Sequence, residues 1–202
     1  MLAALTGAGL SAAAGLNAYI PFLIVAVVAR FTDVINLPAQ YAWIESDWAI
    51  GAAAVLLVGE VVFDKIPVID HINDAIGTFI RPASGGLIFA ATQAADDLEQ
   101  GTSFMQDNPW IGVVLGIVTA GIVHTGKAIS RPVINASTIG IGAPLASTAE
   151  DTASVGLSFV AIFFPVIVVF ALLLMVWGGI VLWRRGRRRR QEREQAVAAY
   201  YG

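Results

Sequence analysis

The chain has 202 residues, of which 57% are apolar and only 13% are charged. Soluble domains usually carry about 25% charged residues, so this composition argues against a soluble protein and for one embedded in a membrane. The absence of cysteine excludes disulfides, thiolate catalysis and cysteine-bound metals. The net charge of −3 hides a segregation, because seven of the twelve Lys and Arg residues stand at or after Arg184.

Six apolar segments follow one another along the chain. A helix that crosses a bilayer needs about 20 mostly apolar residues. Three segments are good candidates for ordinary spans: Trp48–Phe63, Trp110–Ile129 and Ser154–Trp183. Three further segments are apolar but interrupted: Leu2–Ala29 with "GLNAYIP", Ile76–Ala95 with "RPASGG" and Pro132–Thr148 with "NASTIGIGAP".

The interrupted segments are predicted to be broken or re-entrant helices packed inside the bundle. Proline and glycine interrupt the hydrogen-bond ladder of a helix, and at membrane depth the freed backbone groups need protein or water partners. Such segments are therefore unsuited to a lipid-facing position. For 132–148 two alternatives stay open, a full crossing or a dip that returns to the same side.

Orientation follows from the distribution of basic residues, which favour the cytoplasmic side. The tail 184–202 predicts a cytoplasmic C-terminus. Counting back through six crossings leaves the acidic loops 32–47 and 96–108 outside and the N-terminus inside. We therefore expect an all-α polytopic protein of the inner (plasma) membrane with about six crossings. Residues 1–183 would form one transmembrane domain, with halves 1–95 and 109–183 arranged as a 3+3 inverted repeat.

Ionisable and polar side chains cluster beside the breaks. Glu60 and Asp64 share a helix face, as do Asp70 and Asp74, because residues four apart are neighbours on a helix. Charges in a low-dielectric interior must pair or become neutral, so a near-balanced set predicts one polar network drawn from both halves. The predicted network consists of Glu60, Asp64, Lys65, Asp70, His71, Asp74, Arg81, His124, Lys127, Arg131, Asn135, Ser137, Thr138, Glu150 and Asp151.

Each part of this network has a structural alternative. Apolar residues at helical spacing in "VIDHINDAIGTFI" also fit an interfacial helix, in which Asp70, His71 and Asp74 are simply wetted. Lys127 and Arg131 could extend to lipid headgroups. The glycines of "NASTIGIGAP" serve close helix packing as well as ion coordination. Oxygen ligands in "DHINDAIG" suit Mg²⁺ or Ca²⁺, but the spacing alone does not establish a metal site.

Several motifs together resemble a known family. They are "AGLNAYIPFL", the pattern E-x-x-x-DKIP-x-x-DH-x-x-D followed by "TFIRP", then H-x-x-K, "STIGIGAP" and "ED". Over about Gly9–Leu182 the chain resembles small bacterial integral membrane proteins that are catalogued as a domain of unknown function. The family pattern has an arginine where Asn17 stands and an asparagine near Ala143, so charge and polarity differ at these two positions. The resemblance implies a membrane protein and no particular activity.

The patterns favour a transporter or channel for an ion or small solute. The alternatives are a non-catalytic subunit or assembly factor of a membrane complex, and a lipid or lipid-carrier translocase in which Arg81 and Arg131 hold a phosphate headgroup. An enzyme is not expected, because no recognised nucleophile–base motif occurs, and no cofactor is expected. The expected partners are the bilayer, anionic headgroups at the basic tail, and further copies or a larger membrane complex, but not nucleic acid.

Overall fold

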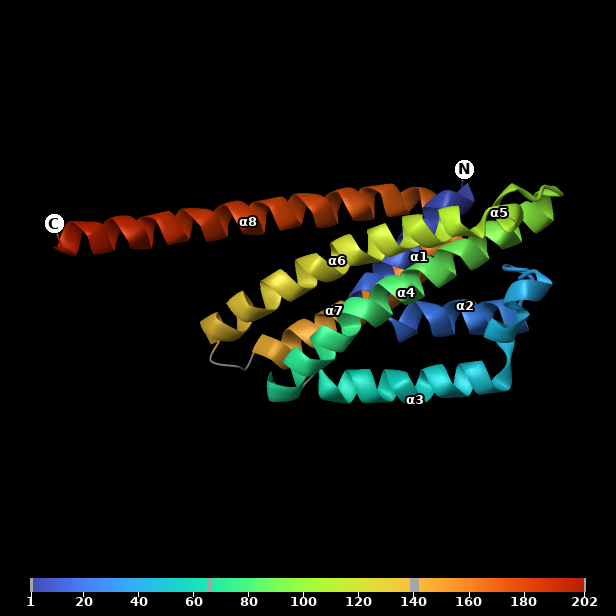
Figure 1. Ribbon diagram of the computed structural model, residues 1–202, viewed down its shortest axis with the longest axis horizontal. Helices are drawn as coiled ribbons and strands as arrows, with labels where there is room; N and C mark the ends of the chain where they lie inside the picture. The colour runs from blue at the N-terminus through green and yellow to red at the C-terminus, as the bar shows by residue number, and fades with distance from the viewer. Residues whose placement is uncertain (1, 65–66, 139–141, 202) are drawn as a thin grey trace. The chain divides into compact units, whose positions relative to one another are not determined.

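A computed structural model describes the backbone of residues 2–64, 67–138 and 142–201 (Figure 1). Every regular element in these ranges is a helix, which confirms the all-α prediction. The chain forms two compact units, Met1–Val168 and Val169–Gly202. The first contains the packed helices, the second is the continuation of one helix, and each is treated by itself.

The elements follow one another with short connections. In chain order they are α1 (Leu2–Leu16), α2 (Tyr19–Phe31), the 3-10 helix η1 (Ala39–Glu45), α3 (Asp47–Phe63), α4 (Pro67–Gln100), the single turn α5 (Phe104–Asp107), α6 (Pro109–Thr138), α7 (Gly142–Phe163) and α8 (Pro165–Tyr201). The basic tail belongs to α8, because this helix continues through residue 201.

Helices α1 and α2 form a hairpin that reverses at Asn17. A Cβ atom added to Gly7 in α1 would lie 3.1 Å from the Phe89 ring of α4. Ala26 in α2 packs with Ala91, which lies at nearly the same level of α4. The two helices therefore run in opposite directions along α4, as their paths in Figure 1 also show.

This hairpin changes the predicted path of the first segment. Leu2–Ala29 does contain a break, as its sequence indicates, but the chain turns back there instead of continuing in the same direction. Leu2 and Phe31 therefore lie at the same end of the first unit, where the count of six crossings had placed them on opposite sides of a bilayer. The side chain of Asn17 accounts for the turn, since its Oδ1 accepts the backbone N–H groups of Tyr19 and Ile20 at 3.0 and 3.2 Å.

The structure corrects two other predictions about where helices are interrupted. The segment Ile76–Ala95 is continuous inside α4, although Pro82 stands within the helix. Proline removes one backbone hydrogen bond and clashes locally, but packed neighbours can hold such a helix together. Conversely, the predicted span Ser154–Trp183 is divided between α7 and α8. Pro165 is the first residue of α8, a position where its missing N–H would be unpaired in any case.

In the segment Pro132–Thr148, for which a break is predicted, α6 is described to Thr138 and α7 from Gly142. Residues 139–141 fall outside the described residues. The two predicted halves do not match helix for helix, because 1–95 contains the α1–α2 hairpin, η1, α3 and most of α4, whereas 109–183 contains α6, α7 and part of α8. The fold as described therefore does not support the 3+3 repeat.

Glycine allows α4 and α6 to approach very closely. A Cβ atom on Gly116 would lie 2.2 Å from the carbonyl oxygen of Gly85, and one on Gly112 would lie 2.8 Å from the Cα atom of Ala90. Such distances leave no space for any side chain. Small residues that let backbones touch are typical of helix contacts inside membranes. We call Gly85, Gly86, Gly112 and Gly116 the glycine contact.

The outer faces of the first unit are largely apolar. Within the described residues, one helix, over Pro109–Arg131, is long and apolar enough by itself to cross a bilayer. A second passes the same test only if η1 and α3, which meet at 53°, form one span. Length and composition of one or two helices are weak evidence, because the core helix of a soluble protein can pass too. The predicted number of crossings therefore stays a prediction.

Candidate functional site

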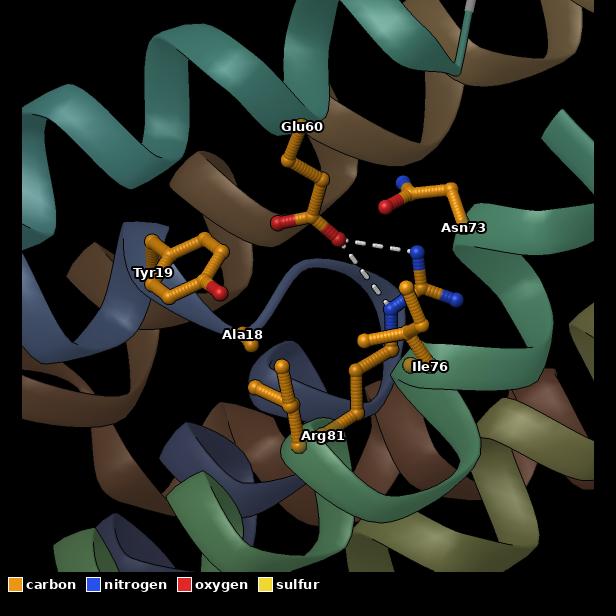
Figure 2. A pocket seen from close by; sticks show the side chains of 8 residues that line it. Ala18, Tyr19, Glu60, Asn73, Ile76 and Arg81 are labelled. Carbon is orange, nitrogen blue, oxygen red and sulfur yellow. Dashed lines mark hydrogen bonds and ion pairs between the residues drawn. The ribbon is translucent and has the colours of Figure 1, made fainter. Parts of the chain in front are cut away.

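The candidate site begins with a buried ion pair between α3 and α4 (Figure 2). Glu60 comes from the last turn of α3, and Arg81 comes from α4 one residue before Pro82. The Oε1 atom of Glu60 accepts hydrogen bonds from Nη2 and Nε of Arg81 at 2.8 and 3.2 Å. Arg81 is fully buried and Glu60 is 6% exposed, so this pair is removed from bulk solvent.

A pocket of about 30 Å³ lies beside this pair. Its walls come from the start of α2, the end of α3 and the first half of α4. They are formed by Ala18, Tyr19, Glu60, Asn73, Ile76, Gly77, Ile80 and Arg81. The second carboxylate oxygen of Glu60, Oε2, is buried and has no hydrogen-bond partner among the described residues. Figure 2 shows it on the side of Tyr19, away from the guanidinium.

Gly77 makes room for Arg81 within α4. A Cβ atom on Gly77 would lie 3.1 Å from Cζ of Arg81. The guanidinium of Arg81 can therefore lie against α4 beside Gly77, one helical turn before Arg81. This packing directs Nη2 to Glu60 and leaves Nη1 3.0 Å from Nδ1 of His124 in α6.

The contact between Arg81 and His124 determines the tautomer of the histidine. Guanidinium nitrogens only donate, so Nδ1 of His124 must be the acceptor in this contact. The ring proton of neutral His124 is then on Nε2, which lies 3.1 Å from Oγ1 of Thr78 and donates to it. His124 is therefore neutral in this arrangement.

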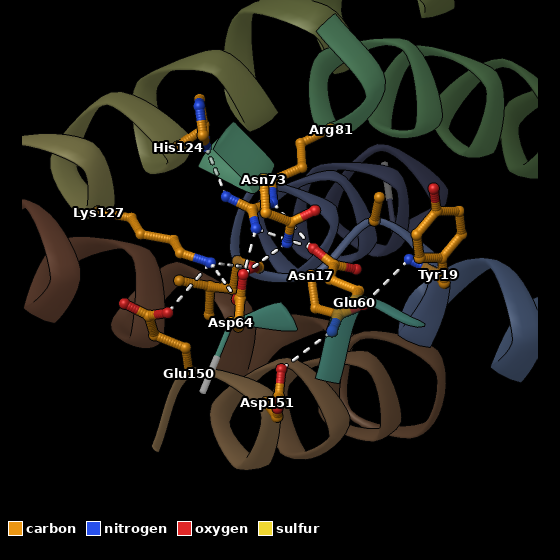
Figure 3. Close-up of polar contacts among 12 residues, drawn as sticks. Asn17, Tyr19, Glu60, Asp64, Asn73, Arg81, His124, Lys127, Glu150 and Asp151 are labelled. Atoms are coloured by element: carbon orange, nitrogen blue, oxygen red, sulfur yellow. Dashed lines mark hydrogen bonds and ion pairs between the residues drawn. The ribbon is translucent and has the colours of Figure 1, made fainter. Parts of the chain in front are cut away.

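Asp64 connects this pair with a second group of charges (Figure 3). It lies at the end of α3 and is 1% exposed. Its Oδ2 is 3.2 Å from Nζ of Lys127 and 3.3 Å from Nη2 of Arg131, both in α6. The same oxygen is 3.7 Å from Nη2 of Arg81. One carboxylate thus contacts three cations from two helices.

Glu150 of α7 closes the network from the other side. Its Oε2 is 2.5 Å from Nη2 of Arg131 and 3.1 Å from Nζ of Lys127. The carboxylates of Glu60, Asp64 and Glu150 formally balance the charges of Arg81, Lys127 and Arg131. Buried charges are tolerated only when they are paired in this way. We call these six residues the charge network.

The tip of the α1–α2 hairpin lies against the charge network. Lys127 donates from Nζ to the carbonyl of Leu16, the last residue of α1, at 3.2 Å. A cation at a helix C-terminus is favourable because unpaired carbonyls carry partial negative charge there. At the same tip, Nδ2 of Asn17 donates to Oδ1 of Asp151 at 2.9 Å, as Figure 3 shows. The helix break, the ion pairs and the pocket thus form one continuous site.

The comparison with protein families bears on the whole of this site. A family model described as "Domain of unknown function (DUF4126)" matches residues 4–185. The chain belongs to the DUF4126 family. The resemblance predicted from the motifs is thereby confirmed, and every residue of the charge network lies within the matched DUF4126 region. Comparison with curated proteins gave no match, and neither did comparison with solved structures.

The electrostatic balance at Asp64 follows from this packing in the DUF4126 domain. Oδ2 of Asp64 contacts the cations of Lys127 and Arg131, and its Oδ1 accepts from Nδ2 of Asn73. Asp64 is therefore the anionic centre of the network.

The structure brings together eight of the residues predicted for the site. They are Glu60, Asp64, Arg81, His124, Lys127, Arg131, Glu150 and Asp151. Lys65 lies outside the described residues, as do the side chains of Asp70, His71, Asp74, Asn135, Ser137 and Thr138. Within the described part of the chain, no group of three His, Cys, Asp or Glu residues could hold a metal ion.

Two residues of this DUF4126 site were not among those predicted. Asn73 donates from Nδ2 to Oδ1 of Asp64 at 2.5 Å, and Asn17 joins the hairpin tip to α7. A signal for the first was available, because Asn73, Gly77 and Arg81 are spaced four residues apart and share a face of α4. The role of Asn17 depends on the reversal of the chain, which the sequence pattern does not indicate.

Proposed function

We propose that this protein is an integral membrane transporter for a small ion, with a pathway that passes the Glu60 pocket at the tip of the α1–α2 hairpin. The observation that carries the proposal is that Glu60, whose buried Oε2 has no partner among the described residues, lines a pocket at the point where the chain turns from α1 to α2. Interrupted helices and ionisable groups at membrane depth are the usual construction of transport sites.

Membrane embedding is supported by the distribution of side chains. Only 28% of the apolar window in α6 is buried, although the core helix of a soluble protein would be mostly buried. Large apolar side chains such as Val118 and Ile122 of α6 and Val58 of α3 are exposed, while the interior contains glycine, alanine, serine and charged residues. Monomeric soluble proteins rarely expose apolar surface on this scale.

The hairpin leads to a proposed topology that differs from six crossings. Helices α3, α4, α6 and α7 and the apolar part of α8, Pro165–Gly178, would cross the bilayer, which makes five crossings. The α1–α2 hairpin would enter and leave on one side. Its two helices run in opposite directions from the turn at Asn17, so the chain would return to the side from which it entered.

Charge supports one orientation for this topology. The open end of the hairpin and the region where α4 leads through α5 to α6 are acidic, with Asp33, Asp47, Asp96, Glu99 and Asp107 among their residues. Basic residues favour the cytoplasm, so this end would face outward and the basic tail would lie inside. The N-terminus would then be outside, together with the open end of the hairpin.

The charge network would lie toward the cytoplasmic end of the membrane. Lys127 stands 17 residues after Trp110, which corresponds to about 26 Å along α6. Tryptophan favours the membrane interface, and Trp43, Trp48 and Trp110 are all exposed near the acidic loops. A short path from the cytoplasm and a longer one from outside would therefore lead to the Glu60 pocket.

The other functions receive less support from the contacts. In a lipid translocase, Arg81 and Arg131 would hold a phosphate, but both guanidinium groups already contact carboxylates within the network. A subunit or assembly role has one specific observation in its favour, which is the exposed apolar face of α6. Stable association of the purified protein with a second membrane protein through this face would support that role.

Cysteine labelling tests the topology, because the native chain contains no cysteine. Ala4→Cys and Thr102→Cys should react with a membrane-impermeant thiol reagent from outside, and Arg184→Cys only from inside. Reaction of Ala4→Cys only from inside would show that the N-terminus lies in the cytoplasm, which would contradict the hairpin topology.

Flux assays test transport itself. Purified protein in sealed liposomes should move H⁺, Na⁺ or K⁺ down an imposed gradient, and Glu60→Gln should abolish that movement. Glu99→Gln is a matched control, because Glu99 is exposed and bonds to Asn36 in the loops far from the pocket. Liposomes that stay impermeable to all three ions would contradict the proposed function.

A further inference from the structure

We infer that the ion bound at the Glu60 pocket is a proton, taken up by Oε2 of Glu60 from water held in the pocket. This inference rests on the proposed function and names the substrate class of that site. The inference starts from the Oε2 atom of Glu60. Glu60 is 94% buried, its Oε1 is bonded to Arg81, and its Oε2 has no protein partner in the described part of the chain.

A buried carboxylate oxygen without a hydrogen bond is costly, so such atoms usually face water or carry a proton. The pocket volume of about 30 Å³ exceeds the roughly 10–15 Å³ that one water requires. Polar groups for such a water are present on the pocket wall, because Asn73 and Tyr19 line it together with Glu60. The pocket thus has the room and the polar groups to hold water beside the carboxylate of Glu60.

The surroundings favour a proton over a metal ion. Arg81 lines the same pocket, and its guanidinium is bonded to the neighbouring oxygen of the same carboxylate. A Na⁺ or K⁺ ion in the pocket would therefore lie close to a fixed positive charge while facing only one carboxylate. A proton avoids this arrangement, because it forms a covalent O–H bond on the side of Glu60 that faces away from Arg81.

The transfer step is balanced within the pocket. Hydronium donates a proton to Oε2, which leaves a neutral carboxylic acid and one water molecule. Arg81 then loses its anionic partner, but Asp64 Oδ2 lies 3.7 Å from its Nη2 and Nδ1 of His124 accepts from its Nη1. The guanidinium can therefore shift toward Asp64 when Glu60 is neutral. Release of the proton would restore the original pair.

Several groups face Glu60 and set the conditions for this step. Burial of Glu60 disfavours its ionised carboxylate, as does the charge of Asp64 at the end of α3, whereas the charges of Arg81 in α4 and Lys127 in α6 favour it. Tyr19 of α2 borders the same pocket. Because the cations and Asp64 are themselves paired in the charge network, the net field at Oε2 depends on whether Arg81 turns toward Glu60 or toward Asp64.

Infrared pH-difference spectroscopy on the protein in liposomes tests the inference directly. A protonated carboxyl group has a carbonyl stretch that is absent from the ionised form. Acidification of the wild-type protein should produce such a band, and Glu60→Gln should remove it. Glu99→Gln is the matched control, because Glu99 is exposed and bonds to Asn36 outside the charge network, and its spectrum should retain the band. Glu60→Asp, which keeps a carboxyl group, should retain a band at an altered midpoint pH and serves if Glu60→Gln fails to fold.

Flux measurements in the same liposomes separate this inference from the proposed function. Proton uptake driven by a pH gradient should fall to the level of protein-free liposomes in Glu60→Gln. Flux of Na⁺ or K⁺ that does not depend on pH would overturn the proton assignment and leave the transporter proposal standing. A Glu60 band without any ion flux would support the proton site and contradict transport. Absence of a Glu60-dependent band would overturn the inference.

Discussion

Helices α4 and α6 take part in both the glycine contact and the charge network, but they make contact there by different means. At the glycine contact, α4 and α6 touch backbone to backbone, and Gly116 has no room for even a methyl group. In the charge network, long side chains of α4 and α6 reach carboxylates of other helices, as in the pairs Arg81–Glu60 and Lys127–Asp64 with the end of α3. One region is filled completely, whereas the other contains a pocket and an unpartnered carboxylate oxygen.

The difference teaches where motion and chemistry are possible. Close-packed backbones transmit force but cannot rearrange without losing contacts. Ion pairs with more than one partner can exchange them, because Asp64 and Glu60 both lie near the guanidinium of Arg81. We therefore expect the glycine contact to act as a fixed support and the charge network to be the part that changes during function. Four single substitutions and one double variant test this division.

The largest effect is expected for Asp64→Asn. This change removes the negative charge that Lys127 and Arg131 share, and an uncompensated buried charge typically costs about 3–5 kcal/mol. The free energy of unfolding, measured by SDS titration of the protein in mixed micelles, should fall by that amount. Asp47→Asn is the control, since Asp47 pairs with Arg30 but is 91% exposed, and its stability should not change measurably.

A double substitution sharpens this test. Adding Lys127→Met to Asp64→Asn removes one cation together with the lost anion. Most of the lost stability should then return, because the network is again close to neutral. If the double variant is no more stable than Asp64→Asn alone, the network is held by shape and not by charge balance.

The next largest effect is expected at the glycine contact. Gly116→Ala places a methyl group 2.2 Å from the carbonyl oxygen of Gly85, and overpacking of this kind costs about 1–3 kcal/mol. Gly121→Ala in the same helix has nothing within 4 Å of its Cβ atom, so it should be neutral or stabilise by up to about 1 kcal/mol. The same titration measures both. Equal stability for the two variants would mean that α4 and α6 do not touch as described.

A moderate effect is expected where the two regions meet, at the hairpin tip. Asn17→Ala removes the acceptor for the N–H groups of Tyr19 and Ile20 and the bond to Asp151, and the loss of such a cap costs about 0.5–2 kcal/mol. Hydrogen exchange of the α2 amides should accelerate at the same time. Asn36→Ala in the exposed loop is the control, and unchanged exchange in Asn17→Ala would argue against the capped reversal.

The smallest effect is expected for Ser11→Ala. Its hydroxyl donates to the carbonyl of Gly85 at 2.8 Å, and one buried hydrogen bond contributes about 0.5–1.5 kcal/mol. Thr119→Ala is matched to it, since Thr119 bonds only to Leu115 within its own helix and its loss should matter less. Thermal unfolding in detergent should show a larger fall in melting temperature for Ser11→Ala than for Thr119→Ala. A larger fall for Thr119→Ala would mean that the Ser11 hydrogen bond does not help to hold α1 against α4.

Much of the architecture could be predicted from the sequence. The all-helical fold, the break near Asn17 and the ends of α3 follow from local patterns, because helix hydrogen bonds join residues four apart and prolines and glycines disrupt them locally. The participation of Glu60, Asp64 and Lys127 in a common network follows from the cost of unpaired charge in an apolar chain. These are properties of composition and short-range spacing.

Only the tertiary structure decided how these parts meet. Nothing local indicates that the chain reverses at Asn17, since a break in a helix does not specify the direction of the next one. Asn17 and Asp151 are 134 residues apart, and Asp64 and Arg131 are 67 apart, so their contacts depend on how whole helices pack. That packing is set by how closely backbones can approach at the glycine contact. The sequence alone thus determined that buried charges must pair, and the helix packing determined which pairs form and left Glu60 lining a pocket.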